Sequence, residues 1–141
     1  MREDINEIII HCADTPNGKP FHASDIDAWH RERGWNEIGY HWVIPLSGIV
    51  EASRHPDKIG SHAEGHNAHS YGICMIGKDR FTKPQWDSLE LLVRRLHGEY
   101  PEARIIGHRD VATNGKTCPN FDVKKWWADG CIPDDKNIWR V

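Results

Sequence analysis

The segment Glu7–His11 constrains the fold of this chain more than any other. Its centre, Ile8-Ile9-Ile10, is an uninterrupted run of β-branched apolar residues, and the turn-rich stretch 13–18 follows it. A short apolar run bounded by turn residues is typical of a strand that is buried on both faces. The sequence therefore predicts a central strand here, with a loop directly after it.

Strand and helix patterns alternate in mixed order along the rest of the chain. The sequence predicts further strands over residues 40–44, 49–53, 70–77 and 104–108, and helices over about 25–33, over 83–98 and after Asp122. Start signals support two of the helices: Ser24 opens an S-x-x-D pattern, and Thr82 opens a T-x-x-Q capping box. We therefore expect an α/β fold with one mixed central sheet and helices packed against it.

Length and charge exclude several classes of protein. The chain has 141 residues, enough for one domain, and its formal net charge is −3, which gives no electrostatic argument for nucleic acid. No apolar run approaches the roughly 20 residues that a membrane span needs, and the acidic N-terminus lacks the features of a signal peptide. We expect neither a nucleic-acid partner nor membrane insertion. We also expect the protein to be made in a cytoplasm.

Histidines and cysteines point to a metal without placing it. The chain has 10 histidines, and its four cysteines form no C-x-x-C pair, which favours free thiols or metal ligands over disulfides. His11 and His108 end two predicted strands, and Cys118 follows ten residues after His108. Two imidazoles and a thiolate are a normal zinc set that leaves a fourth position for water. From the residues alone this set is weak, and a histidine satisfied at a strand end and a small buried cysteine are the simpler explanations.

Five segments that follow one another in a fixed order favour the metal site over ordinary buried residues. They are His11–Thr15, Gly39–Trp42, Gly60–Ala63, Gly107–Val111 and Lys116–Asp122. With this series the chain resembles the zinc-dependent N-acetylmuramoyl-L-alanine amidases of the phage lysozyme type, which share a fold with the peptidoglycan recognition proteins. The resemblance covers about Glu7 to Trp127. It implies cleavage of the amide between the lactyl group of N-acetylmuramic acid and the L-alanine of the peptidoglycan stem peptide.

The resemblance also implies roles for six residues. One Zn²⁺ per chain is expected on His11, His108 and Cys118, while Tyr40 and Lys116 are expected to assist catalysis and His62 to contact the substrate. Residues i and i+2 of an extended segment face the same way, so Lys116 and Cys118 can share one site. There an ammonium stabilises an oxyanion, and the Tyr40 phenol can hydrogen-bond the water or protonate the leaving amine. Without the resemblance, Tyr40 is a packed strand residue and Lys116 a solvated charge.

The implied biological role is that of a phage or prophage endolysin. Such an enzyme is expected to wait in the host bacterial cytoplasm until a phage membrane pore releases it to the cell wall. We expect one catalytic domain over residues 1–141, with a core over about 7–128, no separate cell-wall-binding domain and a monomeric state. Two alternatives stay open, namely a non-catalytic peptidoglycan-binding module and an additional regulator of a phage RNA polymerase, which nothing in the sequence positively supports.

Overall fold

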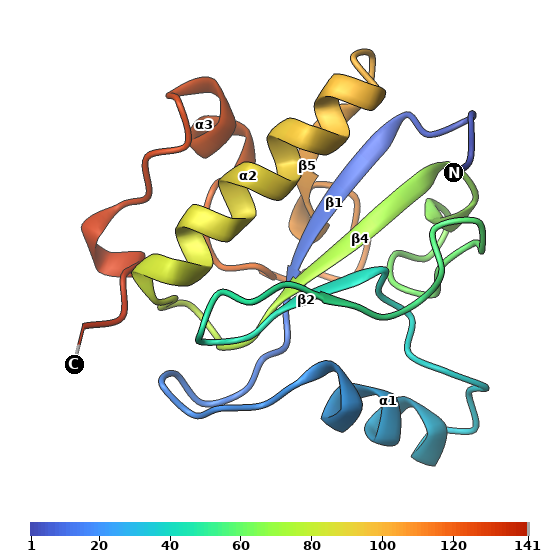
Figure 1. The fold of residues 1–141 in the computed structure, drawn as a ribbon, viewed down its shortest axis with the longest axis horizontal. Helices are drawn as coiled ribbons and strands as arrows, with labels where there is room; N and C mark the ends of the chain where they lie inside the picture. The colour runs from blue at the N-terminus through green and yellow to red at the C-terminus, as the bar shows by residue number, and fades with distance from the viewer. Residues whose placement is uncertain (141) are drawn as a thin grey trace.

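A five-stranded mixed sheet and three α-helices make up residues 1–140, the part of the chain that the computed structural model describes (Figure 1). The strands are β1 (Glu7–Cys12), β2 (Trp42–Ile44), β3 (Glu51–Ala52), β4 (Ser70–Met75) and β5 (Arg104–Gly107). The α-helices are α1 (Ala23–Glu32), α2 (Lys83–Glu99) and α3 (Val123–Ala128), and the 3-10 turns are η1 (Asn67–His69), η2 (His108–Asp110) and η3 (Asp135–Asn137). The expected α/β class is confirmed.

The sheet places β1 at its structural centre. The strand order is β3-β2-β4-β1-β5, and β1 pairs in parallel with β4 and with β5. β2 is parallel to β4, whereas β3 is antiparallel to β2. All six residues of β1 are buried, which confirms the predicted central strand. Because β1, β4 and β5 run in the same direction, their carboxyl ends meet at one edge of the sheet.

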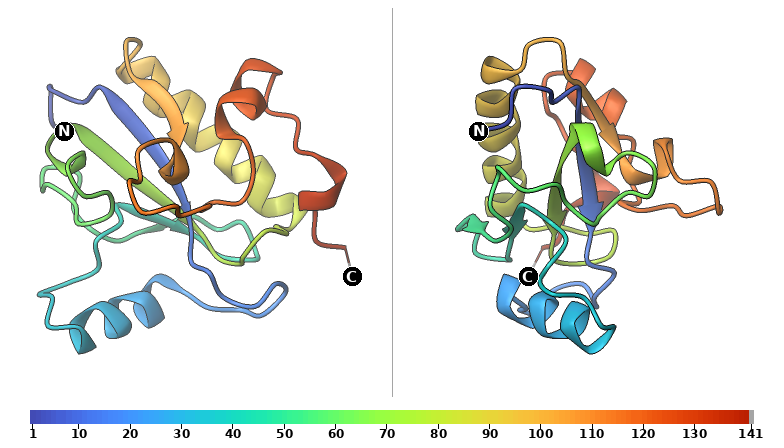
Figure 2. Two further views of the ribbon diagram at one scale, coloured as in Figure 1. Left: turned by 180° about the vertical axis from the view of Figure 1, so that it is seen from behind. Right: turned by 90° about the vertical axis from the view of Figure 1, so that its right-hand side faces the viewer.

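The alternation of side chains along β1 separates the two faces of the sheet. Ile8 and Ile10 pack into the core that α2 and α3 cover, whereas Ile9 packs on the opposite face against Ile106 and Ala63. His11 shares the parity of Ile9 and therefore lies on the face away from α2. Figure 2 shows α2 on one side of the sheet and the loop after β5 on the other.

Helix starts follow the sequence signals in two of three cases. Thr82 and Gln85 form the predicted capping box of α2, and the Asp122 carboxylate accepts the Lys125 N–H at 3.1 Å at the start of α3. The prediction that Ser24 precedes a helix beginning at about residue 25 is wrong, because α1 begins two residues earlier, at Ala23, with His22 as its N-cap. Two carboxylates support the earlier start: Asp25 accepts the His22 N–H at 2.8 Å, and Glu51 of β3, distant in sequence, accepts the Ala23 N–H at 2.8 Å.

The four strands predicted after β1 are all shorter than expected, and those over 70–77 and 104–108 end at Met75 and Gly107. The strand over residues 40–44 begins only at Trp42, and that over 49–53 contains only Glu51–Ala52. Tyr40 and His41 still form sheet-like bonds, since the Tyr40 carbonyl accepts the Arg54 N–H at 3.0 Å. None of the helices within residues 1–140 combines the length and the hydropathy needed to cross a membrane.

His41 is a fully buried histidine that ties a loop to the sheet. Its Nδ1 accepts the Gly72 N–H at 3.1 Å, and its Nε2 donates to the Lys58 carbonyl at 2.8 Å. Burial lowers the pKa of His41 to about 4, although the Lys58 carbonyl raises it; the charges of Arg2 and Arg54 lower it further. The folded chain therefore keeps this imidazole neutral under conditions in which a solvated histidine is protonated.

We predict that His41 makes the metal-free protein less stable in acid. An unfolded histidine takes up a proton near pH 6.5, whereas folded His41 resists protonation until about pH 4. The free energy of unfolding thus falls between these two pH values, by up to about 3 kcal/mol from this residue, and does not depend on it above pH 6.5. Urea unfolding with a chelator present, from pH 7.5 to 4, should give a shallower profile for His41→Asn. Parallel profiles for the two proteins would contradict the prediction.

Candidate metal centre and active-site groove

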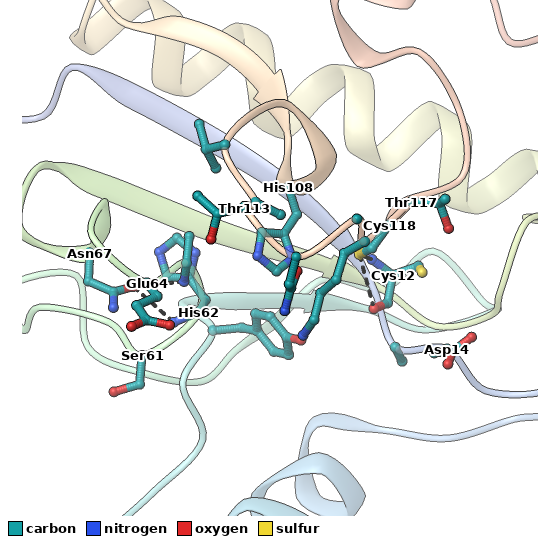
Figure 3. A pocket seen from close by; sticks show the side chains of 18 of the residues that line it. Cys12, Asp14, Ser61, His62, Glu64, Asn67, His108, Thr113, Thr117 and Cys118 are labelled. Carbon is teal, nitrogen blue, oxygen red and sulfur yellow. Dashed lines mark hydrogen bonds between the residues drawn. The ribbon is translucent and has the colours of Figure 1, made fainter.

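A groove of about 920 Å³ lies beside the carboxyl ends of β1 and β5 (Figure 3). Its walls come from residues 12–14 at the end of β1, from residues 30–40 around the end of α1, from the loop 61–67 and from the long loop 108–120. Four segments that are distant in sequence thus converge on one surface hollow. The five sequence motifs all contribute to it or to its floor.

His11, His108 and Cys118 gather at this groove. Their potential ligand atoms all lie within 4.8 Å of one another, and the two imidazole centroids are 4.5 Å apart. His11 is buried in β1, while His108 opens η2 and is half-buried, as is Cys118. Within residues 1–140 no other group of three such side chains comes as close together. The structure therefore brings together the three residues that the sequence predicts as ligands.

Hydrogen bonds hold Cys118 next to β1, although Cys118 lies ten residues after His108 in a long loop. The Arg109 N–H donates to the Cys118 carbonyl at 2.7 Å, and the Cys12 N–H donates to the Cys118 Sγ at 3.0 Å. Asp110 accepts the Gly107 N–H at 2.8 Å and thereby fixes the turn that presents His108. The Cys12 side chain packs with the α2-side core, away from His11, as the alternation predicts.

The local electrostatics favour the protonation states that a metal needs. Burial lowers the pKa of His11 well below its ordinary value, and the neighbouring His62, His108 and Lys116 lower it further. Burial and the Lys116 charge also lower the pKa of His108. Both imidazoles are therefore neutral at pH 7, as metal ligands must be. The main-chain N–H of Cys12 is directed at the Cys118 sulfur.

This donor set fits zinc. Zinc bonds of about 2.0–2.3 Å place tetrahedral ligands roughly 3.3–3.6 Å apart, which small side-chain rotations achieve from the observed spacing. Two neutral imidazoles and one thiolate have the softness that zinc prefers, and three protein ligands are typical of catalytic sites.

Tyr40 and Lys116 lie beside the three ligands. The Tyr40 ring centroid is 5.0 Å from that of His11, and Lys116 lines the groove within electrostatic reach of both histidines. Burial raises the pKa of the Tyr40 phenol well above its ordinary value, and the nearby Cys74 raises it further. Tyr40 is therefore a hydrogen-bond donor at neutral pH, and Lys116 brings a positive charge to the same place.

His62 lies in the groove wall and is only 9% exposed. Its Nδ1 is 2.9 Å from the Nε2 of His11, and its Nε2 is 3.2 Å from the Oγ of Ser70. Burial lowers the pKa of His62 to about 3, so the ring is neutral at pH 7. Its predicted contact with a substrate stays a prediction.

Sequence reasoning missed two residues that build this wall. Asn67 accepts the N–H groups of His62 and Ala63 through its Oδ1, each at 2.9 Å (Figure 3). Ser70 bonds to the far side of the His62 ring. In the sequence Asn67 is one polar residue of a loop and Ser70 the first residue of a strand, so no local pattern singles them out.

Comparison with known proteins places the chain in a family. A family model described as N-acetylmuramoyl-L-alanine amidase matches residues 1–121. The endolysin of Klebsiella phage KP32 is 37% identical over 134 residues, which cover 89% of this chain and 87% of that protein.

The chain belongs to the N-acetylmuramoyl-L-alanine amidase family.

Solved structures of this amidase fold agree with the assignment. The N-acetylmuramoyl-L-alanine amidase LysC from Clostridium intestinale URNW superimposes with a TM-score of 0.78 and 31% identity, covering 89% of this chain and 86% of that one. Wild-type PGRP-LB of Drosophila, a peptidoglycan-recognition protein, gives a TM-score of 0.74 and 28% identity, covering 91% and 80%. The fold and family that the sequence motifs implied are thus confirmed, while the roles of the individual site residues stay predictions.

Proposed function

We propose that this amidase is a zinc-dependent hydrolase that cleaves the bond between N-acetylmuramic acid and L-alanine in peptidoglycan. One observation carries the zinc assignment: His11, His108 and Cys118 converge within 4.8 Å in a groove of an amidase-family fold. These three residues would hold the ion. Bound zinc supplies Lewis acidity and activates water at neutral pH, which is the chemistry that amide hydrolysis requires.

The side chains around the ligands supply the remaining functions. Lys116 offers a positive charge to the carbonyl oxygen of the scissile amide, which gains negative charge when water adds. Tyr40, which keeps its phenol proton, donates a hydrogen bond to the same oxygen or a proton to the leaving amine of L-alanine. Trp35 on the groove wall is 39% exposed and offers an aromatic surface to the sugar or the peptide.

The proposed biological role is that of an endolysin that lyses the bacterial host of a phage. The phage relatives that carry this name support it. On this proposal the chain is monomeric and stays in the host cytoplasm until a phage membrane pore releases it to the wall. Cys118, Tyr40 and Lys116 all lie at the groove, which argues against a module that only binds peptidoglycan.

Digestion of purified peptidoglycan tests the reaction directly. We expect free L-alanine amino groups to appear, with no new reducing sugar ends, because the amide and not a glycosidic bond is cleaved. Mass spectrometry of the products, together with amine and reducing-end assays, measures both. New reducing ends without free alanine amines would identify a glycosidase and refute the proposal.

Cys118→Ser tests the ligand set. We expect the variant to stay folded but to lose bound zinc and at least 99% of the activity, because a serine hydroxyl is a poor zinc ligand at neutral pH. Zinc content after dialysis, circular dichroism and turnover are the measurements. Cys131→Ser is the matched control, since Cys131 is buried in the α2-side core and should leave zinc content unchanged. Stoichiometric zinc with normal turnover in Cys118→Ser would remove Cys118 from the site.

Lys116→Ala separates catalysis from metal binding. We expect normal zinc content and a kcat lowered about a hundredfold, the usual cost of removing one oxyanion-stabilising group. Lys83→Ala is the control, because Lys83 is an exposed α2 residue paired with Asp87 on the other side of the sheet. Equal kcat values in the two variants would return Lys116 to the role of a solvated surface charge.

A further inference from the structure

The His62 ring is held in a slot that two glycines create. A Cβ atom at Gly72 would lie 2.6 Å from the Cγ of His62, and one at Gly60 would lie 2.6 Å from its Cδ2. Neither glycine has a left-handed backbone angle; a side chain at Gly72 would meet the His62 ring, and one at Gly60 would meet this ring, the Gly39 carbonyl and the His41 ring. Asn67 fixes the main chain of His62 as well. The slot and this bond therefore fix the plane of the imidazole.

Both nitrogens of this ring have partners inside the protein. Nδ1 faces the Nε2 of His11 at 2.9 Å, and Nε2 faces the Oγ of Ser70 at 3.2 Å. Neither nitrogen is left for a substrate. A ring that is clamped in this way and only 9% exposed is better suited to orient a neighbour than to recognise a ligand.

The contact between the two imidazoles has only two proton arrangements. If His62 donates from Nδ1, the neutral His11 carries its own proton on Nδ1 and has no lone pair for a metal. If His11 donates from Nε2, its Nδ1 lone pair is free. The His11 Nε2 is engaged by His62 in both arrangements. A metal bound by His11 therefore requires His62 to accept at Nδ1 and to direct its own proton from Nε2 to Ser70.

We propose that His62 is a positioning residue that, together with Ser70, selects the Nε2–H tautomer of His11 and fixes its ring so that Nδ1 is presented to zinc. Histidine ligands commonly donate their second N–H to an acceptor that sets their orientation, usually a carboxylate or a carbonyl. Here the neutral imidazole of His62 is the acceptor for His11, and its own N–H donates to the Ser70 hydroxyl. The inference rests on the proposed function, because it takes His11 as a zinc ligand.

Variants at position 62 separate orientation from substrate contact. His62→Leu fills the slot without an acceptor, whereas His62→Asn places its Oδ1 near the position of Nδ1. We expect His62→Leu to raise the zinc Kd about ten- to a hundredfold, as the loss of such partners does, and His62→Asn to restore it to within about threefold. Ser70→Ala should raise it by a smaller factor. Competition with a chromophoric chelator measures the zinc Kd.

His66→Leu is the control for loosening of the loop. His66 lies on the same loop and bonds to Glu7 at 2.8 Å without touching a proposed ligand, so its loss should leave the zinc Kd unchanged. An equal rise in zinc Kd in His66→Leu would reduce His62 to a structural role. An unchanged zinc Kd in His62→Leu, with a raised KM, would make His62 the substrate contact instead.

The wild-type protein supplies a measurement that needs no variant to fold. Long-range ¹H–¹⁵N NMR of histidine rings should show a proton on Nε2 of both His11 and His62 in the zinc-loaded protein. A proton on Nδ1 of His62 would overturn the inference. If the wild type binds zinc and hydrolyses the amide but the two histidines show other protonated nitrogens, the proposed function stands and only the inference about His62 is wrong. If the wild type binds no zinc, the proposed function and the inference are both wrong.

Discussion

The parallel pairing of β1 with β4 on one side and with β5 on the other determines where the two proposed histidine ligands lie. It buries the isoleucines of β1, and their alternation turns His11 towards the face that α2 does not cover. It also ends β5 beside β1, so that His108 follows directly next to His11. A shift of one residue in this register would exchange the two faces and move His11 into the α2-side core.

The third ligand depends on a loop rather than on the sheet. Cys118 reaches the centre because main-chain bonds from Arg109 and Cys12 hold its carbonyl and its sulfur. His62 in the groove wall is held beside these residues by Asn67, Ser70 and two glycines, Gly60 and Gly72. The sheet edge thus carries two of the proposed ligands, while hydrogen bonds hold the third proposed ligand and the wall around His62 next to it.

Much of this architecture could be predicted from local pattern. The apolar run of β1 and the capping box of α2 are encoded by neighbouring residues, and the ordered motifs indicated the family and the candidate ligands. The start of α1 at Ala23 depends in part on Glu51, which is 28 residues away, in addition to the local cap from Asp25. The residues around His62 also depend on distant contacts: Ser70 and Gly72 contact the His62 ring only because β4 lies beside the loop 61–67. Non-local contacts of this kind leave no periodic signal in a single sequence.

The bond from the Cys12 N–H to the Cys118 sulfur has an evolutionary consequence. The donor belongs to the main chain, so every amino acid except proline supplies it at position 12. Selection on that side chain is therefore free to follow the packing of the core behind it, while the sulfur keeps its hydrogen bond. Two adjacent residues of β1 thus contribute to the proposed metal centre in different ways, His11 through its side chain and Cys12 through a main-chain group common to almost all residues.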